Sequence, residues 1–194
     1  MPALARFLKR LFGDSPSREA AMRHYVAAVG AARHPFFYER LAVPDTVDGR
    51  FDLVVLHVWL LMERLRTIGE MCRPMQMMLQ EALFADMDRS LREMGVGDLS
   101  VGRHVRDMAS AWFGRLGAYD AALVSDDPSA LAEALVRNLW RGTAPDAGAV
   151  EAMVDYVRRQ HRHLAAQDDE ALCEGHVDFL APDDAGTEAE TIDD

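Results

Sequence analysis

The stretch from Asp48 to Ile68 reads DGRFDLVVLHVWLLMERLRTI, and it decides the fold. Its middle, residues 53–62, is apolar except for His57. A helix of this composition carries apolar side chains on every face, which is typical of a helix covered on all sides by others. The run is about half as long as the roughly 20 residues that a membrane span needs. We therefore expect a buried central helix with other helices packed around it.

Outside this stretch, apolar residues recur every three or four positions, which places them on one face of a helix. Such stripes begin at Met22, Met75, Val101, Leu131 and Val150. No stretch of useful length alternates apolar and polar residues as a half-buried strand does. The segments between the stripes are short, which suits antiparallel neighbours. The sequence therefore predicts an all-α, single-domain bundle of about six or seven helices.

The acidic charge of the chain is concentrated at its C-terminal end. The 194 residues carry a net charge of −11. Residues 168–194 contain 11 acidic and no basic side chains, so the rest of the chain is neutral. Low hydrophobicity with charge of one sign is typical of disorder and disfavours nucleic acid as a partner. We expect a helical domain over residues 15–167 and a largely disordered acidic tail over residues 168–194, unless the apolar patch at 176–180 docks on the domain.

Residues 1–14 form a short, basic, amphipathic segment without an acidic residue from 3 to 12. One interpretation is an ordinary first helix that packs on the bundle, because so short a helix is marginally stable alone. The other is peripheral contact with anionic lipid at the inner face of the cytoplasmic membrane. The residues that would make this membrane contact are Leu4, Arg6, Phe7, Leu8, Lys9, Arg10 and Leu11.

No pattern in the chain indicates catalysis or a cofactor. Cys72 and Cys173 lack metal-binding spacing and, without a secretory signal, are expected to be reduced thiols of a cytoplasmic protein. His57 lies in the most apolar segment, where a histidine is more often hydrogen-bonded to backbone than a metal ligand. His161 and His163 are two residues apart and therefore point to different faces of a helix. We predict no enzyme, no cofactor and no metal site.

Methionines and acidic residues between 62 and 98 suggest a binding surface. Seven of the 11 methionines lie between residues 62 and 94. Methionine suits surfaces that accept irregular apolar partners, although filling the core is its alternative use. Asp86, Asp88, Glu93 and Asp98 lack the Glu-x-x-His pattern of a di-iron bundle. Asp88 is instead spaced to pair with Arg92 on an exposed helix face.

Four stretches of the sequence together carry a family resemblance. They are residues 43–52 (VPDTVDGRFD), 56–58 (LHV), 83–98 (LFADMDRSLREMGVGD) and 113–116 (FGRL) with Tyr119. Over about residues 20–140 the chain resembles the ubiquinol-cytochrome c chaperone family. The resemblance implies an all-helical, non-enzymatic assembly factor for the cytochrome bc1 complex. Mitochondrial members of this family help newly made cytochrome b enter that complex, acting with a small helper protein near the ribosome. The lack of a mitochondrial-type presequence favours a bacterial member.

We therefore expect a protein that binds cytochrome b or another bc1 component, with a small helper protein as a further partner. A groove beside the methionine-rich helix would hold an apolar segment of the client, and charged residues at its rim would set the register. The predicted partner-binding residues are Met77, Met78, Phe84, Asp86, Asp88, Arg92, Glu93 and Asp98. Two other function classes stay open: a lipid- or quinone-binding helical protein, and a metal or redox protein with a histidine site.

Overall fold

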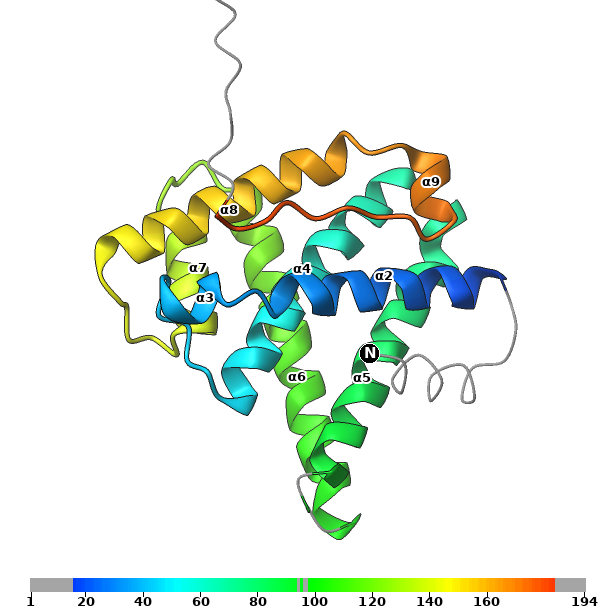
Figure 1. Cartoon of the computed structure of the whole chain (residues 1–194), viewed down its shortest axis with the longest axis horizontal. Helices are drawn as coiled ribbons and strands as arrows, with labels where there is room; N and C mark the ends of the chain where they lie inside the picture. Colours follow the sequence, from blue (N-terminus) through cyan, green and yellow to red (C-terminus); the bar gives the residue numbers. More distant parts are fainter. Residues whose placement is uncertain (1–15, 94, 96–97, 184–194) are drawn as a thin grey trace, which may run out of the picture.

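The computed structural model describes residues 16–93, residue 95 and residues 98–183. Every regular element in this part of the chain is a helix (Figure 1), which confirms the all-α prediction. Six of these helices have ten or more residues. In chain order the elements are α2 (Pro16–Ala32), α3 (Phe36–Glu39), α4 (Val47–Ile68), the 3₁₀ turn η1 (Glu70–Cys72), α5 (Arg73–Glu93), α6 (Asp98–Leu123), α7 (Ala130–Leu139), α8 (Ala147–Ala165) and α9 (Asp169–Cys173).

Helix α4 is the central helix of the fold, as its apolar sequence predicts. Two apolar clusters meet on it. Leu56 and Leu60 pack with residues of α7 and α8, whereas Val58 and Leu61 pack with residues of α2 and α5. Fully burying a side chain of this size is worth about 1.5–3 kcal/mol. Because twelve residues of α4 are buried, this one helix holds both halves of the core together.

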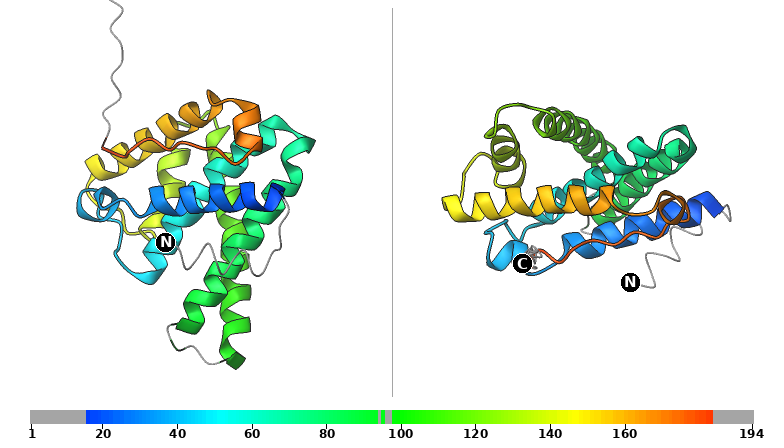
Figure 2. Two further views of the ribbon diagram at one scale, coloured as in Figure 1. Left: turned by 45° about the vertical axis from the view of Figure 1, so that its right-hand side comes forward. Right: turned by 90° about the horizontal axis from the view of Figure 1, so that it is seen from above.

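Helices α5 and α6 form a long hairpin. Figures 1 and 2 show the end of α5 and the start of α6 extending beyond the other helices. Nearer the body, α5 packs on α2 and α4, and α6 packs on α7. Leu79, Leu83 and Met87 are buried at four-residue spacing on one face of α5. Leu91, one turn further along this face, lies near Phe51 and Val54 in the first turns of α4.

Residues 168–183 pack on the helical domain, although their acidic composition predicts disorder. After α9 the chain runs alongside α2, between it and α8 (Figures 1 and 2). Val177 and Phe179 contact both apolar clusters, while Asp178 between them is exposed. In an extended segment alternate side chains point to the same side, so Val177 and Phe179 form an apolar face that the average composition of the segment does not reveal. The structure thus shows the docked alternative for the patch at 176–180 and adds the short helix α9, while residues 184–194 lie outside the described part.

Two glutamine side chains bind the backbone of this extended segment, here called the C-terminal strap (residues 174–183). Gln160 donates from Nε2 to the carbonyl of Leu180 at 2.7 Å and accepts from its N–H at 3.3 Å. Gln167 donates to the carbonyl of Asp178 at 2.7 Å and accepts from its N–H at 3.0 Å. The amide groups satisfy backbone polar atoms that would otherwise need water or a neighbouring strand. The docked part of the chain therefore extends past residue 167, where the sequence places the end of the domain.

No helix among the described residues is both long enough and apolar enough to cross a membrane. The predicted membrane-contact residues, from Leu4 to Leu11, lie outside the described residues.

Gly49, in the first turn of α4, has no room for a side chain. Thr46 begins this helix by accepting a hydrogen bond from the Gly49 N–H at 3.1 Å. A Cβ on Gly49 would lie 2.0 Å from the carbonyl oxygen of Pro44. We expect Gly49→Ala to lower the free energy of unfolding by about 1–3 kcal/mol, the usual cost of overpacking, in chemical denaturation.

The matched control for this substitution is Gly117→Ala in α6. A Cβ at Gly117 meets nothing within 4 Å. Alanine is the better helix former, so this variant should gain about 0.5–1 kcal/mol. Equal stability of the two variants would contradict the close packing at Gly49.

Candidate functional site

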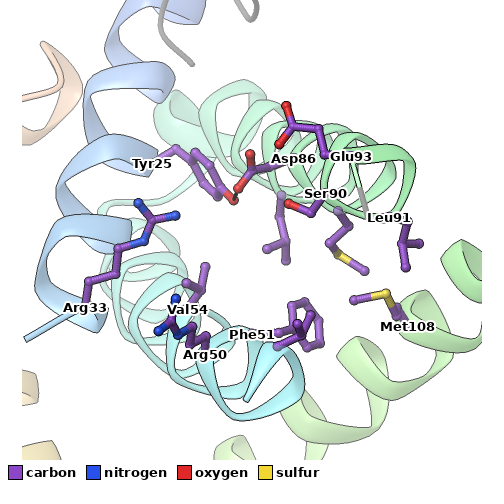
Figure 3. A pocket seen from close by; sticks show the side chains of 13 residues that line it. Tyr25, Arg33, Arg50, Phe51, Val54, Asp86, Ser90, Leu91, Glu93 and Met108 are labelled. Carbon is purple, nitrogen blue, oxygen red and sulfur yellow. Dashed lines mark hydrogen bonds between the residues drawn. The ribbon is translucent and has the colours of Figure 1, made fainter. Parts of the chain in front are cut away.

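A groove lies between α2, α4, α5 and α6 where the hairpin leaves the body (Figure 3). Its volume is about 340 Å³. This is near the small end of the range for ligand pockets, about 300–1,000 Å³, so the groove fits a few large side chains rather than a whole helix. The residues that line it are Tyr25, Arg33, Val47, Arg50, Phe51, Val54, Leu83, Asp86, Met87, Ser90, Leu91, Glu93 and Met108.

The floor of the groove is apolar. Leu83, Met87 and Leu91 follow one another at four-residue spacing on α5, so they share a face. Phe51 from the first turns of α4 and Met108 from α6 face them across the groove. Two flexible methionines in a wall of this kind let it adapt to side chains of different shape.

The rim of the groove carries opposite charges on two sides (Figure 3). Arg33 and Arg50 lie on one side, from α2 and α4, and Asp86 and Glu93 lie on the other, from α5. The Tyr25 hydroxyl donates a hydrogen bond to Asp86 at 2.9 Å. Burial and this carboxylate raise the pKa of Tyr25, so the phenol stays a donor and fixes Asp86 at the rim. The arrangement favours a bound segment with opposite charges at its two ends.

The structure divides the predicted partner-binding residues among different surfaces. Asp86 and Glu93 line the groove, and Phe84 is half-buried against the cluster that α5 shares with α2. Asp88 and Arg92 pair on an exposed face at 2.7 Å, as their spacing predicts. Asp98 begins α6, and its side chain lies outside the described residues.

Met77 and Met78 line a second hollow of about 300 Å³ near the start of α5. Met77 is 61% exposed, because it lies off the face of α5 that carries the buried Met75 and Leu79. Pro74 completes the apolar part of this hollow, and Arg18, Glu70, Arg73 and Glu81 surround it. Helix α5 therefore contributes to both the groove and the second hollow, and its sequence alone does not show that these are two different surfaces.

A buried ion cluster that sequence reasoning missed joins three parts of the fold. Asp52 of α4 is fully buried, with Arg115 of α6 2.7 Å from one carboxylate oxygen and Arg141, just after α7, 3.3 Å from the other. Burial raises the pKa of Asp52 to about 6, against the opposing effect of the two arginines. The Arg115 guanidinium also lies 5.8 Å from the ring centre of Phe51, which lines the groove. A carboxylate directly before the apolar run of residues 53–62 was the only signal in the sequence for this cluster.

His57 and His161 are held by hydrogen-bond partners within the protein. His57 is 2.7 Å from the carbonyl of Leu53 through Nδ1, which confirms the predicted backbone hydrogen bond. Its Nε2 is 2.7 Å from the Tyr156 hydroxyl, a partner that the sequence did not indicate. His161 is half-buried, and its Nε2 lies 3.0 Å from a carboxylate oxygen of Glu63. No group of three or more His, Cys, Asp or Glu side chains within the described residues is arranged to hold a metal ion.

His24 differs from these because it is fully buried and its ring nitrogens have no hydrogen-bond partner among the described residues. Burial, with smaller contributions from Arg23 and His176, lowers its pKa from 6.5 to about 4. Burial also lowers the pKa of His57 to about 4. Both side chains are therefore neutral inside the folded protein near neutral pH.

We expect the protein to lose stability as the pH falls from 6.5 to 4. The unfolded chain protonates each of these histidines at its ordinary pKa of 6.5 and the folded chain only near 4, which costs about 3 kcal/mol per histidine. Asp52 acts in the opposite direction between pH 6 and 3.8, by about 3 kcal/mol, because its folded pKa is the higher one. The two histidines outweigh it. Free energies of unfolding measured by denaturant titration across this pH range check the sign.

The variant His24→Leu isolates one of these contributions. It should be at least as stable as the parent protein at pH 7.5, because it removes an unsatisfied buried polar group. Between pH 6.5 and 4 its loss of stability should be smaller by up to about 3 kcal/mol. An unchanged acid loss would show that His24 protonates as easily in the folded protein as in the unfolded chain.

Comparison with known proteins gives consistent matches. The chain matches the ubiquinol-cytochrome c chaperone family over residues 39–179. It is 30% identical over 153 residues to ubiquinol-cytochrome-c reductase complex assembly factor 1 of Xenopus laevis, covering 79% of this chain and 76% of the frog protein. It is 31% identical over 151 residues to protein CBP3, mitochondrial, of Saccharomyces cerevisiae, covering 76% of this chain and 45% of the yeast protein.

A solved structure is similar over most of its length. The crystal structure of the Cbp3 homolog from Brucella abortus superposes with a TM-score of 0.78 at 33% identity, covering 87% of this chain and 93% of that chain. The prediction of a non-enzymatic protein agrees with these matches, which are to chaperones and assembly factors. The match over residues 39–179 contains all of the sequence motifs, including the two that the Asp52–Arg115 pair joins, and the chain belongs to the ubiquinol-cytochrome c chaperone family.

Proposed function

We propose that this protein is an assembly factor for the cytochrome bc1 complex and that it binds newly made cytochrome b through the groove between α2, α4, α5 and α6. The observation that carries the assembly role is the family match over residues 39–179. The Xenopus relative is named as an assembly factor of the ubiquinol-cytochrome-c reductase complex. The groove supplies the surface that such a role needs, because an assembly factor holds its client by contacts rather than by chemistry.

The chemistry of the groove fits an apolar client segment. A newly made membrane protein exposes apolar side chains that are unfavourable in water, and an apolar floor shields a few of them. The floor formed by Leu83, Met87 and Met108 provides this cover. The adaptable methionine side chains tolerate the irregular shape of a segment that has not reached its final fold.

The charges at the rim give the proposed binding a direction. A basic side chain of the bound segment favours the side with Asp86 and Glu93. Acidic groups at the other end of the segment favour Arg33 and Arg50. Asp88 and Arg92 pair on another face of α5, and we propose that a small helper protein or a further part of the client binds there, with Asp98 at the start of α6 as a further contact. The hollow beside Met77 and Met78 is a second apolar surface for the same partners.

The test is complementation of a strain that lacks the gene. Ser90 is exposed and lines the groove, so Ser90→Arg places a long cation in it, within reach of Asp86 on the previous turn. We expect client affinity to fall by about 2 kcal/mol, roughly thirtyfold. Cytochrome b and assembled bc1 complex should then fall towards the levels of the deletion strain, as measured by immunoblotting and reduced-haem spectra of membranes.

The matched control is Ser110→Arg. Ser110 is an exposed serine on α6 that does not line the groove, so this variant adds the same charge elsewhere. It should restore the bc1 complex fully. Equal complementation by both variants would rule out the groove as the client site. Normal bc1 assembly in the deletion strain itself would contradict the assembly role.

We further propose that residues 1–12 hold the protein at the inner face of the cytoplasmic membrane, where a newly made membrane protein appears. The apolar residues Leu4, Phe7, Leu8 and Leu11 would insert among lipids, and the neighbouring cations would contact anionic headgroups.

Removing residues 1–12 should shift the protein from the membrane fraction to the supernatant of a cell lysate. High salt should release part of the full-length protein, because the attraction of cations to anionic lipid is screened. Identical distribution of the full-length and shortened proteins would contradict the membrane contact.

A further inference from the structure

The two cysteines of the chain, 101 positions apart in the sequence, meet in the folded protein. The sulfur atoms of Cys72 and Cys173 lie 2.8 Å apart. This is closer than the roughly 3.5–4 Å at which non-bonded carbon atoms pack. Cys72 ends the 3₁₀ turn η1 just before α5, and Cys173 ends α9 just before the C-terminal strap. The two cysteines therefore lie where η1 and α9, which are distant in the sequence, contact each other in the fold.

The surroundings hold α9 in place for this meeting. Arg64 of α4 donates hydrogen bonds to the carbonyls of Leu164 at 2.9 Å and Gln167 at 2.8 Å, and it also pairs with Asp169 in the first turn of α9. Leu172, next to Cys173, is fully buried in the cluster that contains Cys72. Contacts with the rest of the fold, rather than the thiols themselves, thus bring the sulfur atoms together.

From this juxtaposition we infer that Cys72 and Cys173 are a modification site at which a reversible disulfide closes. The bond joins α9 and the C-terminal strap to the start of α5. Disulfides of cytoplasmic proteins are transient and respond to the redox state of the compartment, which is consistent with both cysteines being free thiols in the form described above. The site does not depend on the groove or on the identity of the client.

The oxidant is a small disulfide such as oxidised glutathione. The Cys173 thiolate attacks one of its sulfur atoms, which forms a mixed disulfide and releases one glutathione thiolate. The Cys72 sulfur then attacks the Cys173 sulfur, loses its proton, and releases the second glutathione. Two protein thiols and one oxidised glutathione become one protein disulfide and two reduced glutathiones, so two electrons pass from the cysteines to glutathione.

Exposure sets the order of these two steps. Cys173 is partly exposed, whereas Cys72 is 1% exposed, so a reagent in solution reaches Cys173 first. Burial, with a contribution from Cys173, raises the pKa of Cys72 to about 12, so Cys72 is a poor nucleophile towards a reagent in solution and reacts through its short distance to the Cys173 sulfur. Cys72 therefore acts as the resolving cysteine.

Closing the disulfide fastens the C-terminal strap. Val177 and Phe179 of the strap cover both apolar clusters, and the strap lies only a few residues beyond Cys173. A bond that closes a loop of about 100 residues restricts the unfolded chain strongly. Opening of the strap and of α9 should then become rarer in the oxidised protein.

The full-length protein is incubated with oxidised glutathione and analysed by intact mass spectrometry. We expect loss of two hydrogen atoms without a bound glutathione, and the number of free thiols in denaturant should fall from two to zero. The melting temperature should rise by roughly 5–10 °C, and dithiothreitol should reverse each change. Cleavage and peptide mapping should recover one cross-linked pair containing Cys72 and Cys173.

Two single variants make the outcome decisive. Cys72→Ser should retain one glutathione on Cys173, because no resolving thiol remains, and Cys173→Ser should keep Cys72 as a free thiol. Neither should gain thermal stability on oxidation. Two bound glutathiones on the parent protein, or two unreacted thiols, would overturn the inference.

Discussion

The structure depends on the burial of α4 on all of its faces. So many apolar side chains cannot be covered by one neighbour, so α2 and α5 cover one side and α7 and α8 the other. The polar groups that α4 carries inside then need partners, because an unpaired buried polar group is costly. Asp52 pairs with Arg115 of α6, His57 with Tyr156 of α8, and Arg64 with carbonyls at the end of α8. Each of these groups fixes one neighbouring helix.

The groove arises where this cover is incomplete. Near the start of α4, Phe51 and Val54 are only half-buried, because α5 and α6 continue past the body instead of closing over them. The uncovered apolar surface is then available to a partner. Arg115 connects this surface to the core, since the same guanidinium that pairs with Asp52 lies near the ring of Phe51. Parts of three motif stretches, residues 43–52, 83–98 and 113–116, thus meet in space beside the proposed client site.

Features that depend on residues close together in the sequence were predicted correctly, whereas features that depend on contacts between distant segments were not. The central helix, the Asp88–Arg92 pair and the backbone bond of His57 were predicted, because each depends on residues within one helix. Composition did not decide whether the patch at 176–180 docks, because Val177 and Phe179 pack on two clusters assembled from elsewhere in the chain. For the site, Asp86 and Glu93 were among the predicted residues and they line the groove, whereas Arg33 and Phe51 were not predicted, because they come from other helices.

The sequence by itself determined that the protein is all-helical, which segment lies at its centre, and, through its motifs, which family it belongs to. Periodicity and motif order are local properties of the chain and survive without coordinates. Only the tertiary structure decided which surface stays open, which charges face each other across it, and that Cys72 meets Cys173. Those outcomes depend on how helices far apart in the sequence pack, and the spacing of apolar residues along one helix does not say which other helix covers them.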